Sequence, residues 1–155
     1  MIRCLALISW VIWAGAAAAD DAVEQTTSER WAEDQSIVFD ANSVDIDELL
    51  WLARPVIVFA DSPNDPRLLQ QLDLFAERPD DLAERDVILL TDTDPATRGL
   101  WRTELRPRGF MLVIMGKDGE VELRKPAPWD VREITRSIDK MPLRQQEVEA
   151  RRATE

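Results

Sequence analysis

Three short apolar runs, each flanked by residues that break secondary structure, constrain the fold of this chain more than any other feature. The runs are Val56–Ala60, Val87–Leu90 and Phe110–Met115. Continuous runs of β-branched and other apolar residues are typical of strands buried on both faces of a sheet. Because helical periodicity lies between and after the runs, the sequence predicts an α/β domain with helices on both faces of the sheet.

Weaker patterns complete the predicted order of elements. A short strand at Ile37–Phe39 precedes the first run, and the alternating segment Glu120–Arg124 follows a hairpin turn at Gly116–Gly119 as an edge strand. The chain therefore has the order βαβαβαββα and a mixed five-stranded sheet. Right-handed crossovers make the first three strands parallel and leave the final hairpin antiparallel.

The N-terminal residues have the three parts of a secretory signal peptide. Arg3 supplies a positive charge, Cys4–Trp13 is an apolar run too short to span a membrane, and Ala17 and Ala19 form a small-residue box. We therefore expect cleavage between Ala19 and Asp20, and a periplasmic or secreted protein with no stable membrane insertion after cleavage. The alternative is an uncleaved N-terminal anchor.

These patterns divide the chain into four parts. Residues 1–19 are the expected signal peptide, and residues 20–35 are an acidic leader that lacks an apolar period and is expected to be flexible. Trp31 within the leader either docks on the domain, which we favour, or is available to a partner. Trp51, Trp101 and Trp129 lie in or beside amphipathic elements and are expected to be core or half-buried anchors. Residues 36–141 form the α/β domain, and residues 142–155 are a charged C-terminal tail or frayed helix.

The composition of the expected mature chain excludes several kinds of chemistry. Cys4 is the only cysteine and leaves with the signal peptide, and the whole chain has no histidine and no tyrosine. Ser-His-Asp and Cys-His catalysis, thiol redox cycles and zinc sites with Cys or His ligands are therefore excluded. A net charge of −11 argues against a nucleic-acid partner. We expect no cofactor.

Polar residues follow two strands that are neighbours in the predicted sheet. The loops Asp61–Pro66 and Asp92–Pro95 come directly after buried runs, so they should lie side by side at the carboxyl edge, where open α/β sheets bind ligands. The ligand-binding candidates at this edge are Asp61, Ser62, Asn64, Asp65, Arg67, Asp92, Asp94 and Arg108.

Two ligand chemistries fit these candidates, and each has a local alternative. The carboxylates, with Ser62 and Asn64, could bind calcium or magnesium, whereas a helix N-terminus with Arg67 and Arg108 would suit a small anion or a partner's carboxylate. The alternative is that the aspartates cap helices and turns and pair with the arginines. We favour this alternative, with Asp94 as the N-cap of a helix.

Residues Ser36 to Met141 resemble the thioredoxin-like group, with a buried strand, a loop, a long helix, and later a strand-Lys-Asp-Gly-strand hairpin and a closing helix. The motifs are more specifically similar to the uncharacterised bacterial DUDES-type family, the domain of unknown function 4174, whose members are similar to peroxiredoxins. The segments that carry this second resemblance are Phe59–Ser62, Leu90–Asp94, Arg108–Phe110 and Gly116–Gly119.

The resemblance implies a thioredoxin-like three-layer sandwich with a pocket at the loop end of the sheet. Arg108 and Gly109 stand where peroxiredoxins keep an arginine beside the peroxide site, but Pro63 and Pro66 replace the two cysteines of thioredoxin. We therefore expect a non-catalytic periplasmic binding or accessory domain that uses the loop end for an unknown protein or small ligand. The alternatives are a peroxiredoxin-like oxidoreductase lineage that lost its thiol, and a carboxylate-dependent metal-binding hydrolase.

Overall fold

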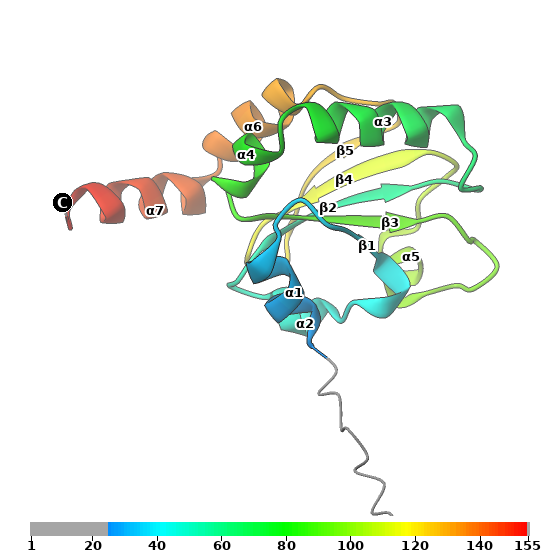
Figure 1. The fold of residues 1–155 in the computed structure, drawn as a ribbon, viewed down its shortest axis with the longest axis horizontal. Helices are drawn as coiled ribbons and strands as arrows, with labels where there is room; N and C mark the ends of the chain where they lie inside the picture. The colour runs from blue at the N-terminus through cyan, green and yellow to red at the C-terminus, as the bar shows by residue number, and fades with distance from the viewer. Residues whose placement is uncertain (1–24, 155) are drawn as a thin grey trace, which may run out of the picture.

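The computed structural model describes residues 25–154 and shows a sheet between two layers of helices (Figure 1). The signal peptide and its expected cleavage site lie outside the described residues. The elements in chain order are α1 (Thr27–Glu33), β1 (Val38–Asp40), the 3-10 helix η1 (Ala41–Ser43), α2 (Ile46–Leu49), β2 (Arg54–Phe59), α3 (Pro66–Glu77), α4 (Pro79–Ala83), β3 (Val87–Asp92), α5 (Leu100–Leu105), β4 (Met111–Met115), β5 (Val121–Lys125), α6 (Val131–Asp139) and α7 (Pro142–Arg152).

The sheet has five strands in the order β1-β3-β2-β4-β5. Strands β1 and β2 both run parallel to β3, whereas β4 is antiparallel to β2 and β5 is antiparallel to β4. This confirms the mixed five-stranded sheet and the strand directions predicted from the sequence. The carboxyl ends of β2 and β3 are therefore adjacent, since Phe59 pairs with Asp92 in the register.

Helices α3, α4 and α6 cover one face of the sheet, and α1, α2 and α5 cover the other (Figure 1). The β2 side chains show why both faces are closed: Val56 and Val58 belong to the apolar cluster under α3 and α6, and Ile57 and Phe59 belong to the cluster under α5. Alternate residues of a strand point to opposite faces, so a continuous apolar run serves both clusters. The predicted three-layer thioredoxin-like sandwich is confirmed.

Helix α3 begins where local chemistry requires it. The Asp65 carboxylate accepts a hydrogen bond from the Arg67 backbone N–H at 2.9 Å, and Pro66 occupies the first helical position, where no N–H donor is needed. Phe75 faces the sheet, and the helix ends before Pro79. This arrangement places the Asp61–Pro66 loop at the carboxyl end of β2.

The expectation that residues 20–35 are flexible is wrong for residues 27–33, which form helix α1. Helix α1 begins at a capping box formed by Thr26 and Glu29, which satisfies two backbone N–H groups at its start. Trp31 is buried, and its indole Nε1 donates a hydrogen bond to the Val87 carbonyl at 3.1 Å. One aromatic anchor therefore holds this helix, although the helix has no sustained apolar stripe.

The C-terminal residues, expected to be a charged tail or a frayed helix, form a docked helix. Helix α7 follows α6 directly, with Pro142 at its first turn, and extends away from the sheet (Figure 1). Arg144 is its buried residue, and Glu147 anchors the helix to the domain through ion pairs with Arg54 and Lys117. Over residues 25–154, no helix combines the length and apolarity that a membrane span requires.

Candidate functional site at the loop end of the sheet

Three segments meet at the carboxyl end of β2 and β3, and we call them together the loop end: residues 60–66, 92–95 and 108–110. The Ala60 N–H donates to the Asp92 carbonyl at 2.9 Å, so the first two segments are adjacent as predicted. The third is close to the first, since a Cβ atom on Gly109 would lie 3.9 Å from Asp61 Oδ2. The φ angle of Gly109 is 60°, which suits glycine at this turn.

A buried ion pair between Arg102 and Asp92 lies at the centre of the loop end. Arg102 reaches back from α5, and its Nε and Nη2 donate to the two Asp92 carboxylate oxygens at 3.1 and 2.9 Å. The same Nη2 donates to the carbonyls of Ala60 and Asp92 at 2.9 and 3.1 Å. The pair therefore joins the carboxyl ends of β2 and β3 to α5, which lies on the face of the sheet opposite to α3.

The burial of this pair explains what it does. The Asp92 side chain is 1% exposed and that of Arg102 is 10% exposed, so each charge depends on the other for solvation. The Arg102 guanidinium also lies over the Phe59 ring at 5.4 Å. A bidentate hydrogen bond between a guanidinium and a carboxylate is strong and directional. Nε and Nη2 of Arg102 are occupied, whereas Nη1 makes no hydrogen bond with the described residues and lies 3.9 Å from Asp61, so only Nη1 has donors left for a ligand.

Asp65 and Arg67 pair with each other beside this centre. Arg67 donates from Nε and Nη2 to the two Asp65 oxygens at 3.1 and 2.8 Å. The hydrogen bonds from the Arg67 side chain and backbone hold the pKa of Asp65 below its ordinary value. The Arg67 guanidinium lies 5.3 Å from the centre of the Phe110 ring. This local pairing is the alternative that the sequence favoured over metal binding.

Asp94 caps a turn and not a helix, which corrects the sequence prediction. Its carboxylate accepts hydrogen bonds from the Thr97 hydroxyl at 2.7 Å and from the Ala96 N–H at 2.9 Å, and these lower its pKa. Helix α5 begins only at Leu100, with Gly99 at its N-cap and no side-chain cap. In the first turn of α5, Trp101 is buried and its Nε1 donates to the Val44 carbonyl at 3.0 Å.

The remaining candidate residues face solvent. Asp61 is 63% exposed, with one oxygen 3.9 Å from Arg102 Nη1, and Ser62 accepts a hydrogen bond from the Asn64 N–H. Asn64 and Arg108 are also exposed. Within residues 25–154, no three acidic side chains come close enough to hold a metal ion. The loop end thus brings the candidate segments together without directing their carboxylates at one point.

Sequence reasoning missed Arg102, the residue that organises the loop end. A strand that ends in a carboxylate, Leu90-Thr91-Asp92, was the available signal, because an aspartate directly after a buried run needs a cationic partner. The partner could not be chosen among the many arginines from spacing alone. Arg102 lies ten residues further along the chain in a helix of the other layer.

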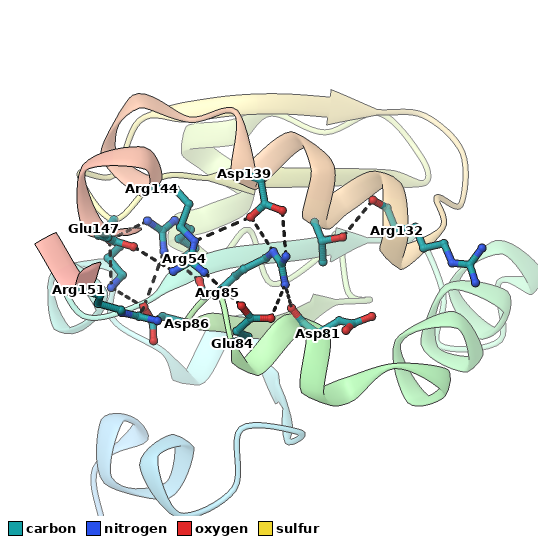
Figure 2. Close-up of polar contacts among 12 residues, drawn as sticks. Arg54, Asp81, Glu84, Arg85, Asp86, Arg132, Asp139, Arg144, Glu147 and Arg151 are labelled. Carbon is teal, nitrogen blue, oxygen red and sulfur yellow. Dashed lines mark hydrogen bonds and ion pairs between the residues drawn. The ribbon is translucent and has the colours of Figure 1, made fainter. Parts of the chain in front are cut away.

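A second cluster of charged residues lies at the opposite end of the sheet and fixes α7 (Figure 2). We call it the C-terminal network, and its centre is Arg54, which is fully buried at the start of β2. Arg54 Nη2 donates to Glu147 of α7 at 2.7 Å, and Nη1 donates to the Arg85 carbonyl at 2.9 Å. Lys117 donates to Asp86 at 2.8 Å and lies 3.3 Å from Glu147.

Glu147 is the carboxylate on which this network depends. Burial would raise the pKa of Glu147, but the hydrogen bond from Arg54 and the charges of Arg54 and Lys117 outweigh burial and lower the pKa. Arg144, which is 3% exposed, has Glu147 as its nearest carboxylate at 3.5 Å. Among residues 25–154, the Nε atoms of Arg54 and Arg144 have no hydrogen-bond partner, so the loss of Glu147 would leave the charge of both arginines still less balanced.

The lowered pKa of Glu147 predicts how the docking of α7 depends on pH. A carboxyl group with a lowered pKa in the folded state contributes stability that is complete at neutral pH and is lost as the pH falls through its folded pKa, below the ordinary value of 4.5. We expect the backbone amides of α7 to exchange with solvent faster at pH 3 than the intrinsic pH dependence of exchange accounts for. In Glu147→Gln this acid-induced step should disappear, and an identical step in both proteins would contradict the assignment.

The chain belongs to the family described as a domain of unknown function (DUF4174), which matches residues 45–147. The matched segment begins at α2 and ends within α7, so it includes both the loop end and Glu147 of the C-terminal network. A comparison with curated proteins gives no match.

Two solved structures from Plasmodium yoelii are similar to this chain. One is described as Prx1a modified at the N-terminus, which forms an artifactual octamer; its TM-score is 0.51 at 15% identity, covering 66% of this chain and 81% of that chain. The other is described as thioredoxin peroxidase I, with a TM-score of 0.48 at 16% identity, covering 66% of this chain and 80% of that chain. The first similarity shows a common fold and nothing beyond it.

Proposed function

We propose that this protein is a non-catalytic binding or accessory domain of thioredoxin-like fold that works in the bacterial periplasm. The observation that carries the proposal is the Arg102–Asp92 pair at the loop end, where open α/β sheets bind ligands. A charged pair that is hydrogen-bonded to the ends of two strands stabilises the sheet. The only cysteine is Cys4, and the chain has no histidine that could act as a base.

A binding role suits the surface around this pair. Asp61, Ser62 and Asn64 are exposed on the turn that links β2 to the capped start of α3, and Arg108 is exposed on the turn before β4. Fixed polar side chains of both charges can recognise a partner protein or a small polar ligand with little loss of conformational entropy. We therefore propose the loop end as the surface that contacts the partner or ligand.

The similarity in fold to a peroxiredoxin fits a related history, in which an oxidoreductase lineage lost its thiol. A protein that lost its thiol and a protein that never had one should both lack thiol chemistry today. A chain without thiols cannot form the sulfenic acid or the mixed disulfide that peroxidase and disulfide-reductase cycles require.

We expect the protein that begins at Asp20 to show no thiol-dependent turnover. Peroxide consumption and the reduction of insulin disulfides should both equal a buffer control, with a thioredoxin and a peroxiredoxin as positive controls. A full-length sample in which Cys4 is replaced by Ser controls for chemistry at the one thiol. Turnover of either kind that survives metal removal would show that the protein is an enzyme.

The periplasmic location has its own test, which rests on the signal-peptide pattern of residues 1–19. Mass spectrometry of the protein from a periplasmic fraction should give Asp20 as the first residue. A product that begins at Met1 and sediments with membranes would contradict export with cleavage.

A further inference from the structure

Trp51 is the most unusual residue on the surface of the described chain. The sequence predicted a core or half-buried anchor, but the side chain is 68% exposed, between the exposed Leu50 and Leu52 at 37% and 39%. Its φ angle is 63°, in the left-handed region that bulky residues rarely adopt. We call Leu50, Trp51 and Leu52 the tryptophan knob.

The backbone of the tryptophan knob is fixed on both sides. The Trp51 N–H donates to the Lys117 carbonyl at 2.7 Å, and the Arg54 N–H donates to the Asp86 carbonyl at 2.7 Å. The turn joins α2 to β2, and glycine would adopt its left-handed conformation without strain. Neither the backbone nor the core therefore favours tryptophan here. Strained residues held by their surroundings are concentrated at sites of function.

Acidic side chains surround the tryptophan knob. Asp47 and Glu48 precede it in α2, and both are exposed. The β4–β5 hairpin turn lies beside it, because a Cβ atom on Gly119 would lie 3.0 Å from Leu50 Cδ2, and the turn carries the exposed residues Asp118 and Glu120. The result is an apolar centre with an acidic border.

Lys117, the cation of the β4–β5 hairpin turn, is paired with other carboxylates. Lys117 is 13% exposed, and its Nζ is bound to Asp86 and lies 3.3 Å from Glu147. Lys117 is therefore paired with carboxylates of the C-terminal network, and Asp118 and Glu120 make no ion pair with it.

We propose that the tryptophan knob is a docking surface for a protein partner that presents an apolar pocket bordered by lysine or arginine. Exposed tryptophan is enriched among the residues that dominate binding energy, and complementary charge at the border speeds association. A second copy of this chain would place acidic borders against each other, and an anionic lipid surface would be repelled in the same way. The surface lies at the end of the sheet opposite the loop end, so this proposal goes beyond the proposed function.

The test uses two synthetic probes of equal length, a helical peptide of leucine and lysine and a matched peptide of leucine and glutamate, each with a fluorescent label. Fluorescence polarisation should show that the wild type binds the lysine peptide, that binding weakens as salt rises, and that the glutamate peptide is not bound. Trp51→Gly should weaken binding at least tenfold. Because a φ of 63° suits glycine, this variant should fold, and its circular dichroism and melting curve check that it does.

Matched variants separate the tryptophan knob from general attraction to an acidic protein. Asp118→Lys with Glu120→Lys should weaken binding, whereas Asp73→Lys with Glu77→Lys on α3 makes the same change in net charge and should change it far less. Leu69→Ser removes another exposed leucine, 48% exposed on α3, and should bind as the wild type does. The proposal is wrong if Trp51→Gly binds the lysine peptide like the wild type, or if both charge variants weaken binding equally. It is also wrong if the tryptophan knob instead drives self-association or binding to anionic vesicles.

Discussion

Asp92→Ala should destabilise the protein by about 3–5 kcal/mol, because it leaves the Arg102 guanidinium in a nearly closed site without its carboxylate. The carbonyls of Ala60 and Asp92 would still accept hydrogen bonds from Arg102, but they cannot balance its charge. The measurement is the free energy of unfolding in urea at pH 7, with the melting temperature as a second observable.

Asp61→Ala is the matched control for this prediction. It removes a carboxylate from the same loop end, and its 3.9 Å contact with Arg102 is solvent-exposed, so the free energy of unfolding should change little. Equal losses in Asp92→Ala and Asp61→Ala would mean that the buried pair does not hold the ends of β2 and β3 together.

Glu147→Ala should cost about 3 kcal/mol and release α7 from the end of the sheet. Arg54 is fully buried and depends on Glu147 for its shortest ion pair, and Arg144 loses its nearest carboxylate in the same variant. Limited trypsin digestion should then cut at Arg144 and Arg151 well before the rest of the domain. Urea unfolding measures the accompanying loss of stability.

Glu149→Ala is the control on the same helix, because Glu149 is exposed and lies outside the C-terminal network. It should leave both the trypsin pattern and the urea midpoint close to those of the wild type. If Glu147→Ala and Glu149→Ala gave the same digestion pattern, α7 would be held by contacts other than the network.

The strands were predictable because their signal is local. An uninterrupted apolar run such as Val56–Ala60 indicates burial on both faces without any knowledge of the partners, and the connection rules then fix the strand directions. The start of α3 was predictable for a similar reason, since an Asp-Pro pair before an amphipathic segment is a cap and a first turn.

The misjudged elements are those whose stability comes from distant partners. Nothing near Trp31 in the sequence predicts that its indole reaches the Val87 carbonyl, and α1 has no other buried residue. The sequence of α7 indicates a charged tail or a frayed helix, because hydrophobic periodicity does not detect a docked helix that is anchored through Glu147. Trp51 was misjudged because the left-handed turn that exposes it depends on the β4–β5 hairpin.

The candidate site was predictable in position and not in organisation. The carboxyl edge of parallel strands brought the Asp61 and Asp92 loops together as topology requires. The partner of each carboxylate is supplied by α5 or by a local turn, and the loop sequences do not reveal which. Only the structure shows that Asp92 is buried against Arg102 while Asp94 caps a turn.

We infer that the Arg102–Asp92 pair holds the ends of β2 and β3 together and is not a reactive group, and a double-mutant cycle on unfolding measures the coupling between the two side chains. Asp92→Leu and Arg102→Met should each lose about 3–5 kcal/mol, and the double variant should lose clearly less than the sum, because it buries no unpaired charge. Residues kept for function commonly impose a cost on stability, so their removal is neutral or stabilising. Single variants at least as stable as the wild type would therefore contradict the claim.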